Sequence, residues 1–511
     1  MKAQGILLGI VLSVLAFLLA FGLAASSARA QTTITAATTT GGNWTSTSPA
    51  TWTCSYPAVS ACIPNNSSSD VFDVGINGGG VLLGPSSSLT AASVSSVSVT
   101  SGQLDVQDGD QLSVSGNVVN SGNVLSIGGS VTSTKDGSTL NVGGNLSLSN
   151  FADMFVGNAG ASGTVNVAGT FDNAGGGQLA ITGGATSASE SVMTVGAAAP
   201  SVLGGMINLF GGGALYPGRG SAGGAVLNYQ GGGEITQLGD GSANPDLVQI
   251  GGSNAFLESG GVSGNSALAG LTTIAPNGHL NLTYGASLTT TGALTDSGSL
   301  AVEDGSVLTA PAVYTEVSGT TAVDGTLISA NVKIDGAIQG TGTVQGALAT
   351  GNGAILRPGS GSGLSGPLGT FTVTGPLDLS GVLYEVIDSD SSFGLTDVSG
   401  QLELGSSSAL DITLGDGYDP PVGTSFAIMN FASLTAGSKF AAVQTFQSPY
   451  YQVSGFIGGN EGWQLTYNPT DIVLTAVELP PVPEPASFLL FGTGLLVVFG
   501  YGLRRKKNLS C

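Results

Sequence analysis

The sequence predicts an all-β protein built as an elongated parallel β-helix, and its composition is the first reason. The chain contains 84 glycines, 41% of its residues are hydrophobic and only 8% are charged. Disordered chains need the opposite balance of low hydrophobicity and high charge. Glycine and β-branched residues also prevail where a helical protein would use alanine, leucine, glutamate and lysine. Many short strands joined by glycine-rich turns fit this composition best.

The second reason is a short motif that returns from about residue 91 onward. Each copy reads apolar, polar, apolar, and a glycine follows within one or two residues. Alternation with a period of two buries one face of a strand, and glycine then turns the chain. The clearest copies are Leu112-Ser113-Val114-Ser115-Gly116, Leu125-Ser126-Ile127-Gly128, Leu140-Asn141-Val142-Gly143, Val165-Asn166-Val167-Ala168-Gly169 and Leu179-Ala180-Ile181-Thr182-Gly183.

The spacing of these copies is the third reason. Their starts are separated by 13, 15, 25 and 14 residues, which suits coils of about 20 to 28 residues with two or three short strands each. Each coil would bury Val, Leu and Ile and expose Ser, Thr and Asn, so the coils are stable only as a stack. An antiparallel β-sandwich is the alternative, and the lack of a fixed hairpin rhythm argues against it.

The N-terminus carries an export signal. Lys2 precedes an apolar stretch over residues 5–25, and Ala28-Arg29-Ala30 offers the small residues that a signal peptidase reads. We therefore expect residues 1–30 to be a signal peptide for the Sec machinery, cleaved between Ala30 and Gln31. An uncleaved N-terminal anchor is the alternative.

The C-terminus predicts a membrane anchor. Residues 486–503 form an unbroken apolar run, and 18 residues of helix cover about 27 Å of a hydrocarbon core about 30 Å thick. A cluster of four cations follows in the tail, residues 504–511, and keeps that tail in the cytoplasm. The cluster is Arg504, Arg505, Lys506 and Lys507. The predicted topology is one pass through the inner membrane, with all earlier mature residues outside the cytoplasm.

A triplet before this span completes a known signal. Pro483, Glu484 and Pro485 close a proline-rich linker, residues 478–485. The triplet, the span and the basic cluster together resemble the PEP-CTERM sorting signal of Gram-negative bacteria, also known as the ice-binding protein C-terminal domain. The resemblance implies an exosortase, a membrane cysteine peptidase, as a partner that cuts near the motif, and release to the cell surface or the extracellular matrix. An ordinary tail anchor would have the same topology.

We expect residues 31–90 to cap the first coil. Cys54 and Cys62 are the only cysteines between the two targeting segments, and an oxidising compartment favours a disulfide between them. Trp44 and Trp52 bracket a loop in a chain poor in aromatic residues. Indoles at that place either close the open end of the β-helix or form a platform for a ligand.

Residues 336–477 follow irregular repeats over residues 91–335, and they resemble the C-terminal part of autotransporter passenger domains. This resemblance implies the last coils and the cap of a right-handed β-helix. Autotransporters continue into a barrel where this chain continues into a sorting tail, so self-export is not implied. The segments that carry the resemblance are Gly340-Thr341-Gly342-Thr343-Val344, Leu356-Arg357-Pro358-Gly359-Ser360, Leu368-Gly369-Thr370-Phe371-Thr372-Val373 and Gly423-Thr424-Ser425-Phe426-Ala427-Ile428.

The charge of the exported part limits its partners. All 32 acidic residues but only five basic residues lie between the two targeting segments. Such a surface repels phosphate backbones, which argues against nucleic-acid binding and leaves Ca²⁺ and exopolysaccharide as partners to consider. The five basic residues are Lys135, Arg219, Lys333, Arg357 and Lys439.

The sequence predicts no catalytic residues, no metal site and no cofactor. The single histidine, His279, stands in a turn-like setting. Two groups of acids could act as acid and base or hold Ca²⁺, although aspartate at coil corners is common in turns. The groups are Asp105, Asp108 and Asp110, and Asp388 and Asp390.

We therefore expect a non-enzymatic, surface-displayed rod that serves as an adhesin or as a component of an exopolysaccharide matrix. A β-helical polysaccharide lyase or hydrolase is the first alternative. An ice-binding surface protein is the second, but a flat ice-binding face needs a regular threonine ladder, and none recurs along the sequence.

Overall fold

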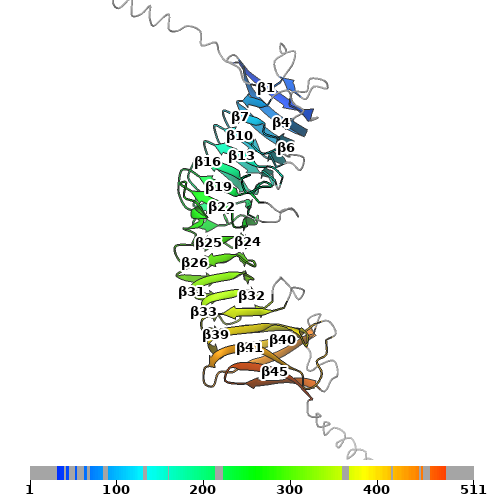
Figure 1. Ribbon diagram of the computed structural model, residues 1–511, viewed down its shortest axis with the longest axis vertical. Helices are drawn as coiled ribbons and strands as arrows, with labels where there is room; N and C mark the ends of the chain where they lie inside the picture. The colour runs from blue at the N-terminus through cyan, green and yellow to red at the C-terminus, as the bar shows by residue number, and fades with distance from the viewer. Residues whose placement is uncertain are drawn as a thin grey trace, which may run out of the picture.

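The computed structural model describes most of the exported part of the chain. It covers residues 32–38, 42–44, 52–54, 63–65, 70–83, 90–129, 135–158, 160–212, 222–359, 368–415, 418–447, 451–452 and 461–478. Figure 1 shows these residues as a stack of coils along one long axis, with the N-terminal strands at one end and the C-terminal strands at the other. Within them the structure is all-β, and the one helix is the 3₁₀ turn η1 (Ser266–Leu268).

The first face of the stack is a seven-stranded sheet. Its strands pair in the order β5, β7, β10, β13, β16, β19, β22, and every pairing is parallel. The strands are β5 (Ala91–Val94), β7 (Gln111–Val114), β10 (Ser138–Val142), β13 (Gly163–Val167), β16 (Ser191–Val195), β19 (Ala225–Tyr229) and β22 (Ala255–Ser259).

A 23-stranded sheet runs the whole length of the stack. Its strands are β1 (Thr32–Thr38), β2 (Gly42–Asn43), β3 (Thr53–Cys54), β4 (Asp70–Leu83), β6 (Ser96–Val106), β8 (Val118–Asn120), β9 (Val124–Ile127), β11 (Leu146–Ser149), β12 (Asp153–Val156), β14 (Phe171–Gly175), β15 (Gln178–Thr182), β18 (Met206–Phe210), β21 (Asp246–Gly251), β24 (Gly278–Thr283), β27 (Ser299–Val302), β30 (Thr320–Val323), β32 (Ala337–Gly340), β34 (Ile355–Pro358), β37 (Val382–Ser389), β38 (Ser392–Phe393), β40 (Ala409–Leu414), β42 (Ala442–Gln447) and β43 (Tyr451–Gln452).

A 15-stranded sheet takes over beside it in the C-terminal half. Its last strands, β41, β45 and β44, pair antiparallel and end the parallel stack. The strands are β17 (Val202–Leu203), β20 (Gln237–Leu238), β23 (Thr273–Ile274), β25 (Ser287–Thr289), β26 (Leu294–Asp296), β28 (Val307–Thr309), β29 (Val313–Glu316), β31 (Thr326–Ile334), β33 (Thr343–Thr350), β35 (Thr370–Val373), β36 (Leu377–Leu379), β39 (Leu395–Leu404), β41 (Ser425–Leu434), β44 (Glu461–Tyr467) and β45 (Asp471–Glu478).

These pairings confirm the predicted parallel β-helix and exclude the antiparallel sandwich. The right-handed twist that the passenger resemblance implies stays a prediction. All five motif copies are strands, but they belong to two faces: β7, β10 and β13 to the seven-stranded sheet, and β9 and β15 to the 23-stranded one. The uneven spacing of the copies thus mixes two series.

The register gives the true coil lengths. Along the seven-stranded sheet Ala91 pairs with Gln111, Gln111 with Thr139 and Thr139 with Thr164, advances of 20, 28 and 25 residues. Later coils are shorter than predicted, because Thr320 pairs with Ala337, an advance of 17 residues.

The core is a set of columns of apolar side chains inside the stack. One column takes the central apolar residue of each strand of the first face, and every member is fully buried. Burial of one such side chain contributes about 1.5–3 kcal/mol. Its members are Leu112, Leu140, Val165, Met193, Leu227 and Leu257.

Residues near the N-terminal end close the first coils. Trp44 and Trp52 are buried, and their rings meet edge to face, with centroids 5.0 Å apart. Trp44 Nε1 donates to the carbonyl of Pro64 at 3.0 Å, and Trp52 Nε1 donates to the carbonyl of Trp44 at 2.8 Å. Both indoles are therefore committed to packing, and neither offers a ring face to a ligand.

Cys54 is disulfide-bonded. Its expected partner, Cys62, lies outside the described residues. So do the signal peptide with Ala30 and Gln31, and residues 479–511 with the sorting triplet and the basic cluster. Their structures are not described further.

Candidate functional site

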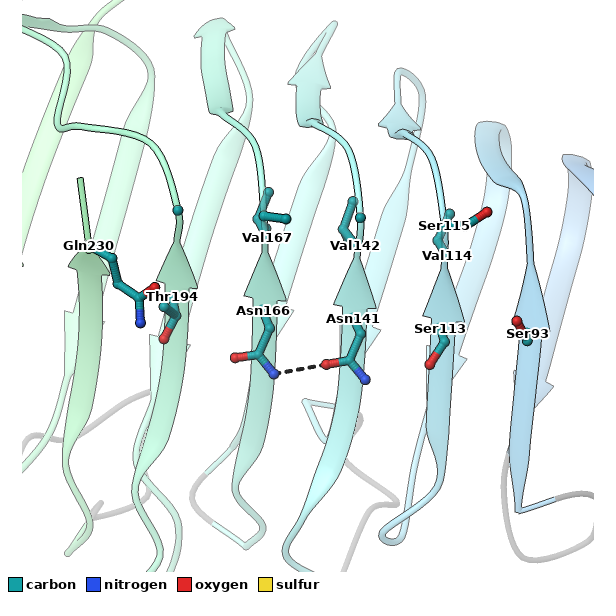
Figure 2. A pocket seen from close by; sticks show the side chains of 13 residues that line it. Ser93, Ser113, Val114, Ser115, Asn141, Val142, Asn166, Val167, Thr194 and Gln230 are labelled. Carbon is teal, nitrogen blue, oxygen red and sulfur yellow. Dashed lines mark hydrogen bonds between the residues drawn. The ribbon is translucent and has the colours of Figure 1, made fainter.

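The most extensive hollow among the described residues with a full polar lining is a groove on the outer face of the seven-stranded sheet. Figure 2 shows that it crosses β5, β7, β10, β13 and β16, with Gln230 at one end, and its volume is about 640 Å³. The lining residues are Ser93, Ser113, Val114, Ser115, Asn141, Val142, Gly143, Asn166, Val167, Ala168, Thr194, Gly196 and Gln230.

A row of polar side chains, which we call the polar column, runs along this groove. Its members pair in register from strand to strand: Ser93, Ser113, Asn141, Asn166 and Thr194. Each follows a buried residue by one position, so the alternation of the strand turns it outward. Asn166 Nδ2 donates to Asn141 Oδ1 at 2.9 Å, which ties two neighbouring coils together (Figure 2).

The groove is hollow because small residues follow the strands. Gly143 and Gly196 lie where the coils pack most closely. A Cβ on Gly143 would lie 2.4 Å from the carbonyl oxygen of Ser115, and one on Gly196 would lie 2.3 Å from that of Ala168. Glycine is required at both places, and the absence of side chains there opens the groove beside the polar column.

The lining carries no ionisable side chain. The register continues past Thr194 to Asn228 and then to Glu258, which lies beyond the groove. Burial raises the pKa of Glu258, the amide of Gly264 lowers it and the charge of Glu190 raises it. An acidic pair therefore lies past one end of an uncharged groove.

The first predicted group of acids lies elsewhere, on the edge between faces. Asp105 is on β6, where burial raises its pKa and hydrogen bonds from Gln103 and Ser126 lower it. Asp108 has a left-handed backbone, with φ of 54°, and accepts a hydrogen bond from the amide of Lys135. Asp110 is buried, and its pKa is raised first by burial and then by Asp108, while Lys135 lowers it. Asp108 thus forms the predicted turn.

The second predicted group is at the far end of the rod. Asp388 and Asp390 lie at the turn between β37 and β38, and the hydroxyl of Tyr418 donates to Asp390. Figure 1 places β6 and β40, the neighbour of β37, near opposite ends of the molecule. The two groups therefore cannot share one substrate site.

His279 was predicted in a turn, and the structure corrects this. It is the second residue of β24 and pairs with Leu247 and Ser299 on the outer face. The turn ends one residue earlier, at Gly278, whose Cβ would lie 2.5 Å from the carbonyl oxygen of Leu238. Across the described ranges, no three His, Cys, Asp or Glu side chains gather closely enough to hold a metal ion.

Threonines do align over three coils of the 15-stranded sheet. Thr273 pairs with Thr295, and Thr295 with Thr315, but Lys333 follows in the next coil. Unequal coil lengths hide this short column in the sequence. Since it ends after three coils, it is not the regular ladder that an ice-binding face needs.

Sequence comparison adds one finding. Residues 481–506 match the family model of the PEP-CTERM protein-sorting motif, which contains the predicted triplet and most of the basic cluster. The motif marks the chain as an exosortase-sorted protein of the cell envelope, outside the cytoplasm, with an exosortase as its processing partner. No curated protein sequence matches the chain.

The predicted membrane span was tested only in part by the structure. No helix in the described part of the chain is long and apolar enough to cross a membrane. Residues 486–503 lie outside that part, so the span remains an expectation from the sequence.

Proposed function

We propose that the exported β-helix is a non-enzymatic rod that binds polysaccharide at the cell surface, as an adhesin or a component of the extracellular matrix. The observation that carries this proposal is the groove with its polar column. Its hydroxyl and amide groups form hydrogen bonds of the kind that sugars use, and its lining has no acid, base or thiol nucleophile. Repetition along the rod lets many weak contacts add up.

The lyase or hydrolase alternative has less support from the geometry. Glycosidases place two carboxyl groups about 5–10 Å apart on either side of the scissile bond. The predicted groups around Asp108 and Asp390 lie near opposite ends of the rod. Ca²⁺ binding at either group remains a separate proposal, since Asp108 and Asp390 accept hydrogen bonds from the protein itself.

Incubation with polysaccharides tests this proposal. We expect the full chain, purified from the envelope in detergent, to retain polysaccharide without shortening it, with or without Ca²⁺. Binding is measured by affinity electrophoresis and chain length by size-exclusion chromatography. Depolymerisation that disappears in Asp108→Asn, Asp110→Asn, Asp388→Asn or Asp390→Asn variants would establish the enzyme instead.

Processing of the sorting tail gives a second prediction. Proline on both sides of Glu484 keeps the backbone extended before the apolar run, which suits a peptidase. In a host with an exosortase we expect mass spectrometry to find mature chains that end near Pro485. The same host without the exosortase serves as the control and should retain chains that end at Cys511. Intact chains in both hosts would show an ordinary tail anchor.

A further inference from the structure

We propose that the groove binds an extended, uncharged polysaccharide whose chain lies along the rod axis, with about one sugar for each coil. This inference rests on the proposed function and adds the site, the ligand class and the orientation. It follows from three properties of the groove: the spacing of the polar column, the hydrogen-bonding groups it presents and the absence of charge in its lining.

The spacing comes from the sheet. Neighbouring strands lie about 4.7–4.9 Å apart, so the five strands of the polar column span about 19 Å. An extended polysaccharide advances by nearly the same distance for each sugar. A chain laid along the axis therefore meets a new polar side chain with each sugar, whereas a chain laid across the axis meets one or two strands only.

The polar column presents matching groups. Asn141 uses its Oδ1 to accept from Asn166 Nδ2, which leaves the Nδ2 donor of Asn141 and the Oδ1 acceptor of Asn166 without a protein partner in the described part of the chain. Figure 2 shows both amides at the open face, flanked by the hydroxyls of Ser113 and Thr194. A sugar hydroxyl both donates and accepts, so it can pair with either amide group or with a hydroxyl.

Charge selects the ligand class. An acidic polysaccharide needs Arg or Lys to neutralise it, and the lining has neither. The whole chain carries a net charge of −21, and its field repels a polyanion. Glu258, two strands beyond Thr194 in register, adds negative charge past one end. An uncharged chain pays none of this repulsion.

The ends of the groove limit the length that it reads. At the N-terminal end Asn65 Oδ1 accepts the amide of Ser93 at 2.9 Å, so the cap segment reaches the first strand. At the other end Gln230, an exposed side chain, closes the lining. Between them the groove holds about four or five sugars at the strand spacing, and affinity should stop rising beyond that length.

The test uses the full chain, purified from the envelope in detergent. The probes are soluble neutral polysaccharides (mixed-linkage β-glucan, xyloglucan and galactomannan), β-glucan oligosaccharides of two to eight sugars, and polygalacturonate as the acidic probe. We expect a neutral polysaccharide to bind, polygalacturonate not to bind, and affinity for the oligosaccharides to level off at about five sugars.

Two double variants locate the site. Asn141→Ala with Asn166→Ala removes the central pair of the polar column and should weaken binding about tenfold or more, since each lost hydrogen bond changes the affinity several-fold. Asn281→Ala with Asn331→Ala is the matched control on outer strand positions of the other two sheets, and its affinity should be unchanged. Circular dichroism checks that each variant keeps its β structure.

Each other outcome has a distinct meaning. Retention of polygalacturonate alone would overturn the uncharged ligand class but keep the proposed function. Neutral binding that the Asn141 and Asn166 variant leaves intact would overturn the groove as the site. Failure to bind any of the polysaccharides would overturn the proposed function and this inference together.

Discussion

The protein should be more stable at pH 5 than at pH 8, and Asp296→Asn should remove a large part of that difference. Asp296 is fully buried on β26, and burial raises its pKa to about 6. The hydrogen bonds from Tyr314 and Gly298 lower this value, and the charge of Glu316 in the next coil raises it. An aspartate in an unfolded chain has a pKa of about 3.9.

The sign follows from these two pKa values. Because the folded-state pKa is the higher one, folding favours the protonated form, and this contribution to stability is fully present below about pH 4. It is lost as the pH rises through about 6. A shift of about two units corresponds to about 3 kcal/mol at pH 8.

The geometry explains why asparagine is the right replacement. Asp296 Oδ1 accepts the amide of Gly298 at 2.9 Å, and Oδ2 lies 2.8 Å from the hydroxyl of Tyr314. That hydroxyl also lies 2.7 Å from Thr321 Oγ1. Asparagine can accept from Gly298 and donate to Tyr314, which then donates to Thr321, as a protonated aspartate would.

Thermal unfolding followed by circular dichroism at pH 5 and pH 8 measures the effect. We expect Asp296→Asn to raise the midpoint at pH 8 by a few degrees and to change it little at pH 5. Asp304→Asn, an exposed acid in the turn between β27 and β28, is the control. A wild-type protein that is equally stable at both values would contradict the prediction.

Other buried acids act in the same direction. Burial raises the pKa of Asp153, Glu303 and Asp411, and that of Glu385, which is fully buried, well above its usual range. Opposed to burial, hydrogen bonds from Ser189 and Ser162 lower the pKa of Asp136. That carboxyl loses its contribution below about pH 4, so we expect the stability maximum on the acidic side of neutrality and above pH 4.

The sequence predicts the strands of this molecule better than it predicts the site. The alternation in Leu140-Asn141-Val142 and Val165-Asn166-Val167 is a local signal, and both segments are strands with the expected buried residues. The polar column depends on register, however. Asn141 and Asn166 become neighbours only because one coil advances by 25 residues, after one of 28, and turn lengths of that kind leave no regular period in the sequence.

The inward acids were missed for a related reason. Alternation puts Asp296 in phase with Leu294, and Glu316 in phase with Tyr314, so both acids point inward. An acid at the end of an apolar strand is usually taken as the first residue of a solvated turn. Only the next coil, which stacks Glu316 on Asp296, shows that these side chains stay inside.

Trp44→Ala should release the N-terminal end of the rod while leaving the C-terminal end intact. Trp44 is fully buried, and its amide donates to the carbonyl of Leu82 on β4 at 2.8 Å. Loss of a buried tryptophan costs about 3–5 kcal/mol. The variant also loses the edge-to-face contact with Trp52 and leaves the carbonyl of Pro64 without its indole donor.

Hydrogen exchange with mass spectrometry distinguishes local from global effects. In a stack whose coils contact only their neighbours, stability is a sum of local terms, so the damage should stay near the substituted coil. We expect faster exchange in β4 and β6 and unchanged exchange from β39 to β45. Trp463→Ala is the reciprocal control, because Trp463 packs on Phe426 at the C-terminal end, with centroids 5.9 Å apart. It should loosen β41, β44 and β45 only. Faster exchange along the whole rod in either variant would show that the coils unfold as one cooperative unit, and the nearest-neighbour account of its stability would then be wrong.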